Sequence, residues 1–485
     1  TALTSLEGTN NQLTYLNMRN GVTEQMVGYF NVSGNNLTCI EVNAEDIAYA
    51  TANWTNANGN IDDGVTFADI CYASNPSYTN VPDDNFEQAL IDLDYDDELD
   101  DYVLTANISG VTSLDVAGKE ISDLTGIEAF TALTYLNCAN NELTSLNVSS
   151  NTALETLYCE NNQLTTLDVS NNTALNNLYC YNNFELGSLD VSSNTALEYL
   201  HCGDGQLASL DVSNNTALFE LQCQGNELTS LDVSANTALT DLNCSYNQLT
   251  SLDVSSNTAL TNLKCHHNSL TSLDVTANTD LTELSCEGND LTSLDVSSNT
   301  ALTFLNFEGN ELTSVDVSNN TALTSLNCEL NQLTSLNVSS NTALTNLVCH
   351  SNQFTSLDVS ANTALTFLNC GFNALTSLDV SANTALTNLY CQNNQLTSLD
   401  VSSNTALGIM YCNENELTSL DVSSNTALTT LQCPDNQLTS LDVSSNTALS
   451  WLNCAQNQLT SLDVSSNTAL TGLLCSNNQL TYLNM

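Results

Sequence analysis

Cysteine has the most regular spacing of any reactive residue in this chain, and a thiol can form disulfides, bind metal or act as a nucleophile. Sixteen of the 18 cysteines form one series with a spacing of 21 residues, lengthened once to 22, and Phe307 fills its single gap. Because phenylalanine takes the same position, we predict a buried apolar position where cysteine packs as a small hydrophobic residue. The sequence contains no C-x-x-C pair, the spacing typical of zinc ligands. The series comprises Cys138, Cys159, Cys180, Cys202, Cys223, Cys244, Cys265, Cys286, Cys328, Cys349, Cys370, Cys391, Cys412, Cys433, Cys454 and Cys475.

The two remaining cysteines, Cys39 and Cys71, lie outside the series. We predict a disulfide between them, which would suit an oxidising, extracellular compartment. The thiols of the series are predicted to stay free. Their neighbours would lie about 5 Å apart, but side chains that all point the same way fit disulfide geometry poorly.

Aspartate recurs once per unit in the sequence S-L-D-V-S, from Asp168 to Asp463, with Asn147 and Asn337 as substitutes. An Asx-type turn explains this row, since asparagine caps such a turn equally well. The alternative is a carboxylate ladder that binds calcium. Neighbouring carboxylates at about 5 Å would repel by about 1–3 kcal/mol, but one carboxylate per unit is few for an ion that takes six to eight oxygens. We therefore predict no cofactor, with calcium as the alternative.

Histidine, the usual general base and metal ligand, occurs at His201, His266, His267 and His350. His201, His266 and His350 are three or four units apart, so we expect them to be too distant to share a metal or a proton. No glycine-rich phosphate loop precedes a helix, and no serine stands in a nucleophile setting. The sequence predicts no metal site and no enzyme.

These residues are positioned by a repeated unit, L-T-x-L-x-C-x-x-N-x-L-T-S-L-D-V-S-x-N-T-A, as in residues 386–406. Alternation in L-x-C turns Leu and Cys inward and predicts one short parallel strand per unit. The asparagine three places after each cysteine is expected to satisfy backbone groups where the chain turns. The D-V-S-x-N-T-A half consists of turn formers, which predicts an irregular or 3₁₀ convex wall.

The motif L-x-x-L-x-C-x-x-N-x-L closely resembles the leucine-rich-repeat consensus, and this version is similar to repeats in secreted proteins of Bacteroidetes-type bacteria. The resemblance covers roughly residues 111–485. It implies an α/β-class, mostly β fold. We expect a right-handed leucine-rich-repeat solenoid with a parallel concave sheet and 21-residue repeats.

A short helix is expected before the repeats, because residues 81–93 have helical apolar spacing. Asp83 or Asp84 would cap its start. The segment resembles the helical amino-terminal cap of internalin-like bacterial proteins, and a solenoid needs such a cap to cover its open end. The predicted apolar face comprises Phe86, Leu90, Ile91 and Leu93.

The two ends of the chain are nearly the same, since residues 1–18 and 468–485 differ at only four positions. This duplication indicates a precursor with a tandem period of 467 residues; alternatively, arrays of this family simply end alike. We predict four segments. They are 1–18, the end of a preceding leucine-rich-repeat array; 19–78, a cap or linker module; 79–130, the helical cap with the first irregular repeats; and 131–485, the solenoid.

The charge balance limits the partners. Three basic residues stand against 55 acidic ones, a formal charge of −52. Such a surface repels phosphate backbones and anionic lipids, so nucleic acid is excluded as a partner, and cations or basic partners are favoured. No apolar run approaches the ~20 residues of a membrane span, so no membrane insertion is expected. An extracellular or cell-surface location fits.

The outward strand positions vary most, so specificity should lie there. Aromatic faces with polar edges suit sugars or protein hot spots, although tyrosine also simply suits strands. The predicted ligand-binding face is formed by Tyr135, Tyr158, Tyr179, Tyr181, Tyr199 and His201. Middle repeats present the acidic residues Glu220, Asp241, Glu283, Glu287, Glu308 and Glu329, and later ones present Phe367, Tyr390, Tyr411 and Trp451.

The tyrosines favour an extracellular cell-surface adhesion or recognition protein that binds a glycan or a protein through the concave sheet. The uniform repeats and duplicated ends favour an alternative, a structural tandem-repeat element of a giant extracellular fibre or sheath. In that case copies would join head to tail into a filament without a discrete ligand. The regular Thr and Asp rows suggest a third function, binding to ice or mineral.

Overall fold

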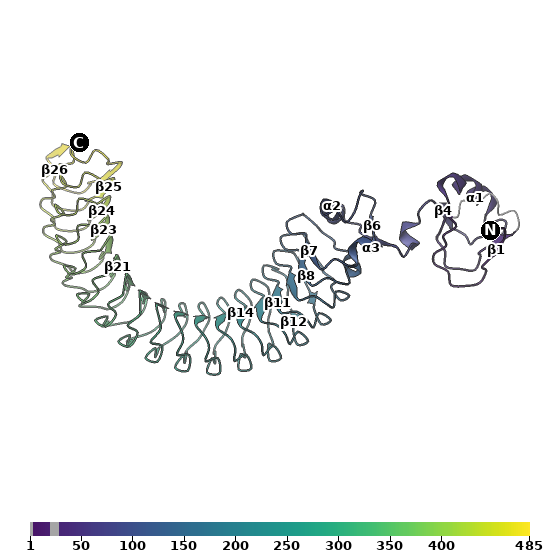
Figure 1. Ribbon diagram of the computed structural model, residues 1–485. Helices are drawn as coiled ribbons and strands as arrows, with labels where there is room; N and C mark the ends of the chain where they lie inside the picture. Colours follow the sequence, from purple (N-terminus) through teal and green to yellow (C-terminus); the bar gives the residue numbers. More distant parts are fainter. Residues whose placement is uncertain (1–2, 20–28) are drawn as a thin grey trace. The chain divides into compact units, whose positions relative to one another are not determined.

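In the computed structural model, each 21-residue unit forms one turn of a solenoid, here called a coil (Figure 1). The structure describes residues 3–19 and 29–485; parts of the predicted segments 1–18 and 19–78 therefore lie outside the described residues. The chain divides into unit 1, Thr1–Leu175 with Asn182–Leu186, and unit 2, Asn176–Tyr181 with Gly187–Met485.

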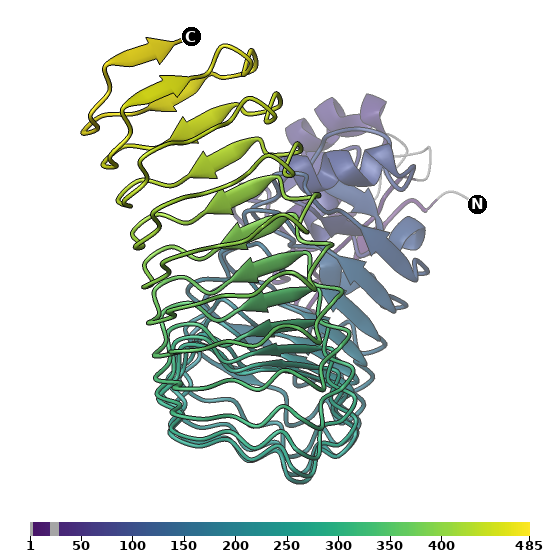
Figure 2. The ribbon, with the colours of Figure 1, turned by 90° about the vertical axis from the view of Figure 1, so that its left-hand side faces the viewer.

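Unit 2 contains one long parallel sheet with one strand per coil. Each residue is paired with the residue of the next coil, for example Leu284 with Leu305. The strands lie side by side and point the same way (Figure 2), on the concave side of the stacked coils (Figure 1). They are β11 (Asn177–Tyr179), β13 (Tyr199–His201), β14 (Glu220–Gln222), β15 (Asp241–Asn243), β16 (Asn262–Lys264), β17 (Glu283–Ser285), β18 (Phe304–Asn306), β19 (Ser325–Asn327), β20 (Asn346–Val348), β21 (Phe367–Asn369), β22 (Asn388–Tyr390), β23 (Ile409–Tyr411), β24 (Thr430–Gln432), β25 (Trp451–Asn453) and β27 (Gly472–Leu474).

The predicted mostly β solenoid with a parallel concave sheet is confirmed. The opposite wall carries only turns and a few short strands, namely β12 (Leu189–Asp190), β26 (Ser461–Asp463) and β28 (Tyr482–Asn484). Inside each coil, Leu284 of the strand and Cys286 just after it are fully buried. Phe307 is equally buried in the next coil, which confirms that the cysteine position is an apolar one.

Two ladders of buried asparagines join the coils. In the predicted ladder, Asn289 donates from Nδ2 to the carbonyls of Cys265 at 3.1 Å and Cys286 at 3.0 Å, and its Oδ1 accepts from the Leu270 N–H at 3.0 Å. The second ladder, formed by the recurring asparagine of the N-T-A half, was not predicted from the sequence. There Asn320, fully buried, donates to the carbonyls of Val296 and Asn299, both at 2.9 Å.

The aspartate row forms the predicted Asx turns. Asp295 Oδ1 accepts from the backbone N–H of Ser297 at 2.9 Å, and the Ser297 hydrogen bonds hold the pKa of Asp295 below its usual value. Its carboxylate therefore orders its own turn. Across residues 3–19 and 29–485, no three acidic, histidine or cysteine side chains gather as metal ligands.

Unit 1 contains the first coils and a separate amino-terminal module. Its coil strands are β7 (Ser113–Asp115), β8 (Tyr135–Asn137) and β9 (Thr156–Tyr158), with β10 (Leu167–Asp168) on the other wall. Its other elements are β1 (Leu6–Glu7), β2 (Phe30–Asn31), β3 (Cys39–Glu41), η2 (Ala44–Asp46), α1 (Ile47–Asn53), β4 (Thr66–Ala68), η3 (Tyr72–Ser74), β5 (Tyr78–Asn80), α2 (Asp84–Asp92), β6 (Tyr102–Leu104), α3 (Thr105–Ile108) and η4 (Ile127–Ala129).

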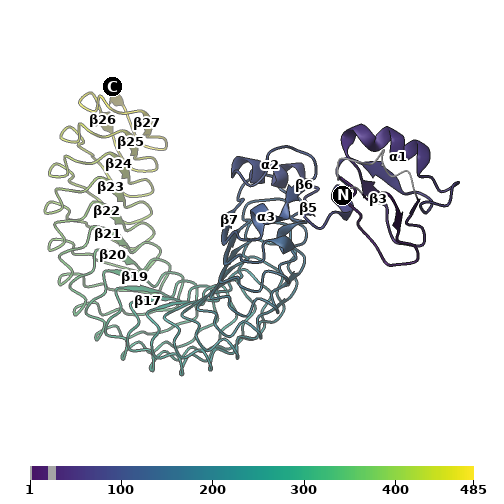
Figure 3. The ribbon, with the colours of Figure 1, turned by 45° about the vertical axis from the view of Figure 1, so that its right-hand side comes forward.

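The predicted capping helix is α2, which lies beside the first coil (Figure 3). Asp83 caps it, accepting from the N–H groups of Asn85 and Phe86 at 3.0 Å. Phe86 and Leu90 are buried as expected, but the prediction for Leu93 is wrong: it is 40% exposed. The reason is that α2 ends at Asp92, so Leu93 lies beyond the helical face.

The amino-terminal module, residues 29–78, has its own core around Phe30, Ile40 and Trp54. A disulfide joins Cys39 to Cys71. Residues 3–18 pack on this module through Leu6, Leu13, Leu16 and Met18. Among the described helices, none is long and apolar enough to cross a membrane.

Candidate functional site

The concave face is built from columns of side chains. In most three-residue strands the middle residue, usually leucine, is buried and its two neighbours are half-buried, for example Asn346 and Val348 around Leu347. Because the strands are in register, each outward residue lies beside its counterpart one coil away, at a spacing of about 4.8 Å. Neighbouring side chains in a column therefore contact one another and form continuous strips.

In unit 1 the structure brings together the first two predicted binding residues. The rings of Tyr135 and Tyr158 lie 5.7 Å apart. Burial raises the pKa of Tyr135 above its usual value, so its hydroxyl stays a neutral hydrogen-bond donor over the physiological range. The pair presents two aromatic faces with hydroxyls at their edges.

In unit 2 the predicted residues form two contacts. Tyr179 meets His201 edge to face at 4.5 Å, and Tyr199 lies 6.0 Å from Phe219. His201 Nε2 is 2.9 Å from Glu220 Oε1, yet burial outweighs this carboxylate and lowers the pKa of the imidazole. His201 is therefore neutral at pH 7. Tyr181 follows β11, just beyond the buried Cys180, and is half-buried.

A second aromatic strip lies towards the end of unit 2, among the later aromatics. Tyr390 contacts Phe367 at 5.3 Å and Tyr411 at 4.9 Å between ring centres. Farther along, Trp451 is 39% exposed. Gly472, its neighbour in the next coil, leaves room for the indole, since a Cβ there would overlap the ring.

Between the two strips, the concave face is acidic. Glu308 and Glu329 lie in one column, and Glu329 also contacts the imidazole of His350. Burial, together with the neighbouring Glu308, raises the pKa of Glu329 to about 7. Burial also lowers the pKa of His350.

This raised pKa predicts a pH effect on stability. A carboxyl whose pKa is higher in the folded chain than in the unfolded chain stabilises the fold at low pH. That stability is lost as pH rises from about 4.5 to about 7. We expect Glu329→Gln to raise the free energy of unfolding at pH 8 by on the order of 1 kcal/mol, after allowance for solvent screening. Urea unfolding at pH 5 and pH 8 measures the difference; the exposed Glu311→Gln is the control and should show none.

A third column follows the strands, at the second residue after each cysteine position. Its backbone is left-handed in every coil, with φ near +55°. Asn and Gly suit this conformation, whereas other side chains are strained by about 1–2 kcal/mol. Nevertheless Tyr246, Leu330 and Phe372 occupy it with φ of 52°, 53° and 52°, and each is at least half exposed. Three large apolar side chains are thus displayed at strained positions.

The ladder thiols are buried and chemically protected. Burial raises the pKa of Cys244 and of Cys370 to about 12, so neither forms a thiolate at neutral pH. Cys475 is only partly buried. We expect a disulfide reagent such as DTNB to modify about one thiol rapidly in the native chain, and Cys475→Ser to abolish that fast phase. Rapid reaction of several thiols before denaturant is added would contradict the buried ladder.

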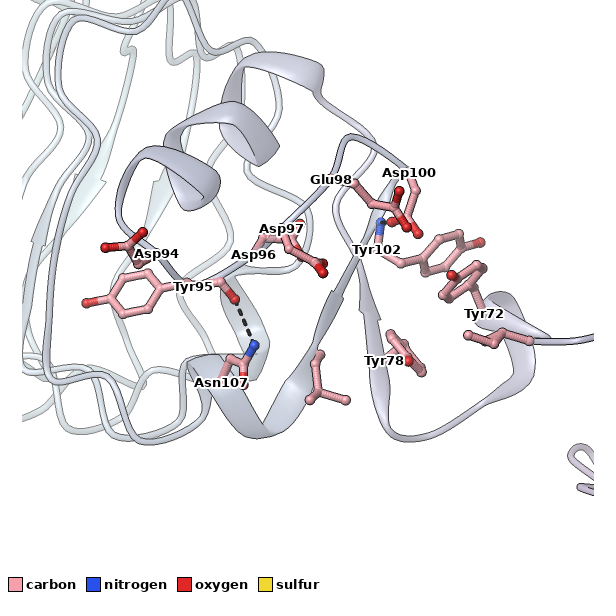
Figure 4. Close-up of a pocket in the computed structure, with 12 residues that line it drawn as sticks. Tyr72, Tyr78, Asp94, Tyr95, Asp96, Asp97, Glu98, Asp100, Tyr102 and Asn107 are labelled. Atoms are coloured by element: carbon pink, nitrogen blue, oxygen red, sulfur yellow. Dashed lines mark hydrogen bonds between the residues drawn. The ribbon is translucent and has the colours of Figure 1, made fainter. Parts of the chain in front are cut away.

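Unit 1 also contains a cleft of about 460 Å³ that the sequence did not reveal (Figure 4). Tyr72 stacks on Tyr102 at 5.0 Å and meets Tyr78 edge-on at 5.0 Å. Burial, then a hydrogen bond to Asp100, raises the pKa of Tyr72 to about 12. Aromatic rings beside carboxylates suit an organic cation. Tyr102 is far from Tyr72 and Tyr78 in the sequence and meets them only because β5 pairs with β6.

Comparison with known proteins gives the following matches. The family model of the LVIVD repeat matches residues 303–327. Internalin J of Listeria monocytogenes serotype 4b (strain F2365) is 38% identical over 70 residues, which make up 14% of this chain and 8% of that protein. The chain thus spans a small part of this curated relative.

Among solved structures, the functional domain of InlJ from Listeria monocytogenes, which includes a cysteine ladder, is 36% identical with a TM-score of 0.59. The match covers 81% of this chain and 78% of that one. A leucine-rich-repeat protein of Leptospira interrogans is 23% identical, with a TM-score of 0.61 over 73% of this chain and 92% of that one. The ectodomain of an Arabidopsis thaliana receptor kinase, solved with Casparian strip integrity factor 2, is 19% identical, with a TM-score of 0.59 over 97% and 64%.

Proposed function

Since the chain is an internalin-like leucine-rich-repeat protein, we propose that it is an extracellular adhesion or recognition protein that binds a protein or a glycan through its concave sheet. The observation that carries this proposal is the set of aromatic contacts along that sheet, above all Tyr135 with Tyr158 and Tyr179 with His201. Half-buried aromatic side chains in fixed positions cost little entropy when a ligand covers them.

The ligand class follows from the polar groups around these rings. Tyrosine hydroxyls, the neutral imidazole of His201 and the carboxylate of Glu220 can all hydrogen-bond to sugar hydroxyls or to a peptide. The formal charge of −52 favours basic partners and opposes anionic ones. We propose binding without catalysis and without a cofactor. The disulfide Cys39–Cys71 supports an extracellular location.

The test is binding of the whole chain to a glycan array and to extracellular protein extracts. We expect Tyr158→Ala and Tyr179→Ala each to weaken binding of any ligand found by about tenfold or more, the usual effect of removing an aromatic hot spot. Asp295→Asn, on the opposite wall, is the matched control and should bind normally, because Asn337 already fills the same position in another coil. A ligand that binds both tyrosine variants with unchanged affinity would contradict the proposal.

A structural role is the second candidate, favoured by the duplication of residues 1–18 at 468–485. In this case the coils would serve as a building element of a fibre or sheath. Electron microscopy of native material distinguishes the two functions. Regular filaments with a head-to-tail repeat support the structural role, and separate particles of about 52 kDa exclude it.

Binding to ice or mineral is less favoured than these two. The threonines beside the sheet use their hydroxyl hydrogens internally. Thr282 Oγ1 donates to the Thr261 carbonyl at 3.0 Å, and Thr303 Oγ1 donates to that of Thr282 at 3.1 Å. A flat row of freely donating hydroxyls is therefore not presented by this column.

A further inference from the structure

Residues 29–42 form one more coil of the solenoid type, although their sequence lacks the 21-residue spacing. Asn35 occupies the asparagine-ladder position. Its Oδ1 accepts from the Leu13 N–H at 3.1 Å, just as Asn478 Oδ1 accepts from the Leu459 N–H at 3.0 Å. Asn35 Nδ2 donates to the carbonyls of Gly8 and Val32, both at 2.8 Å. Gly34, with φ of 74°, takes the left-handed position next to it.

Residues 3–18 are the coil beneath it, and the two coils are joined by the usual backbone bonds. Gly8 N–H donates to the Asn31 carbonyl at 2.8 Å, and Asn10 N–H donates to that of Ser33 at 2.9 Å. At the equivalent positions near the end of the solenoid, Cys454 N–H and Gln456 N–H donate to the carbonyls of Leu474 and Ser476 in the next coil, both at 2.8 Å. The module of residues 29–78 therefore docks on residues 3–18 as a solenoid coil docks on its neighbour.

Residues 470–485 nearly repeat the sequence of residues 3–18, and in the part of the chain that the structure describes no coil covers them. The sequence T-Y-L-N-M ends both segments. Met18 is 4% exposed beneath the module, whereas Met485 is 85% exposed. Tyr482 and Leu483 are also exposed, at 56% and 43%. The last coil thus presents an apolar surface that its duplicate buries.

A buried carboxylate gives this contact its specificity. Glu41 of the module is fully buried. Its Oε2 accepts from Tyr15 Oη at 2.9 Å and from Asn17 Nδ2 at 2.7 Å. Its Oε1 accepts from Cys71 N–H and Asn75 Nδ2 at 3.0 and 2.9 Å. The carboxylate is therefore fully hydrogen-bonded, as a buried charge requires.

The sequence of the coil matches this requirement. Where most other coils have S-L-D-V, residues 15–18 and 482–485 have Y-L-N-M. A short serine becomes a tyrosine and an aspartate becomes an asparagine, and in the first segment the tyrosine hydroxyl and the asparagine amide both donate to Glu41. An aspartate at position 17 would place a second carboxylate against Glu41, and that repulsion is costly in a buried site. Tyr482 and Asn484 thus carry the pair of donors that Glu41 needs; without a module, Asn484 Nδ2 donates to the Asp463 carboxylate at 3.1 Å, a contact that docking would replace.

Two of the four differences between the segments, at Gly8 and Ser5, are compatible with the same contact. A Cβ added at Gly8 would lie 3.5 Å from Val32, ordinary contact distance, so Cys475 fits the position of Gly8. Ser5 Oγ accepts from the Tyr29 N–H at 3.2 Å, a single exposed bond that Gly472 would lack.

We propose that residues 470–485 are a docking surface for a second copy of the 29–78 module, joined behind Met485, so that solenoids succeed one another in a tandem chain. The Y-L-N-M sequence is the recognition element, and Glu41 of the incoming module is its partner. This inference is independent of the proposed ligand binding by the concave sheet.

The test is to extend the full chain by a copy of residues 19–78 after Met485 and to measure hydrogen exchange by mass spectrometry. We expect amides of residues 480–485 to exchange at least tenfold more slowly than in the unextended chain. The double change Tyr482→Ser with Asn484→Asp should remove this protection, and the exposed Gln479→Ser should keep it. Unchanged exchange in an extended chain whose added disulfide has formed would overturn the proposal.

The existing contact provides a second measurement. In the unextended chain, Asn17→Asp should speed exchange in residues 29–42 at least tenfold, and Glu41→Gln added to it should restore protection, because a neutral amide can donate to the new carboxylate. Failure of both effects would show that the Glu41 contact does not hold the module. Head-to-tail association of unextended chains, detected by sedimentation and lost in the Tyr482 and Asn484 double variant, would assign the surface to another molecule and overturn the tandem arrangement.

Discussion

Replacing Asn320 by aspartate is expected to lower the free energy of unfolding by about 3–5 kcal/mol, whereas alanine at this position should cost about 2–3 kcal/mol. Asn320 is fully buried, and its Nδ2 donates to the carbonyls of Val296 and Asn299. Alanine removes one of the two donors that each carbonyl has, since Val296 and Asn299 also accept from the backbone N–H groups of Asn299 and Leu302. Aspartate, in addition, places a charge without a partner among acceptors.

Asn319 supplies the matched control for this prediction. It is the preceding residue and also donates to a carbonyl of the coil before it, Ser297 at 3.1 Å, but it is exposed. Asn319→Asp should therefore cost less than about 1 kcal/mol. Urea unfolding followed by circular dichroism measures both variants. Equal losses for the two aspartates would show that the buried ladder contributes nothing special to stability.

The second large effect that we expect is an increase in stability. We expect the triple variant Tyr246→Asn, Leu330→Asn and Phe372→Asn to raise the free energy of unfolding by about 2–4 kcal/mol, because asparagine tolerates the left-handed backbone that strains these residues. The three sites lie at least two coils apart, so their effects should add.

The control for the gain is Asn393→Ala, at the same position of another coil, where φ is 54°. This change should destabilise the chain, since alanine lacks the asparagine preference. If the triple variant is no more stable than the original chain, the left-handed column stores no strain. If it is more stable, the three exposed apolar side chains lower the stability of the fold, which indicates that they contact another molecule.

Features that depend on local pattern could be predicted from the sequence. The 21-residue spacing, the apolar cysteine position shown by Phe307, the cap of α2 by Asp83 and the Asx turns each follow from residue type and spacing. Leu93 was misplaced because a helical pattern does not show the residue at which the helix ends.

Features that depend on pairing between coils could not be predicted. The contact of His201 with Glu220 requires the register of β13 and β14, and the Tyr72 cluster requires β5 to pair with β6. The coil at residues 29–42 could not be predicted because its spacing is irregular. Gly8 and Val32 fill the position that cysteine takes in other coils, but they are 24 residues apart instead of 21. The left-handed column was hidden because Tyr246 and Phe372 are residues that spacing alone would not assign to such a backbone.

In both asparagine ladders, the side-chain amide hydrogen-bonds to residues that come earlier in the sequence. Asn289 exchanges hydrogen bonds with Cys265 and Leu270, and Asn320 donates to Val296 and Asn299, all residues that precede it. During synthesis, each new coil therefore meets its buried amide partners already made and folded behind it. A chain that leaves the ribosome amino terminus first can thus fold as it emerges, one coil at a time, starting from the end covered by α2.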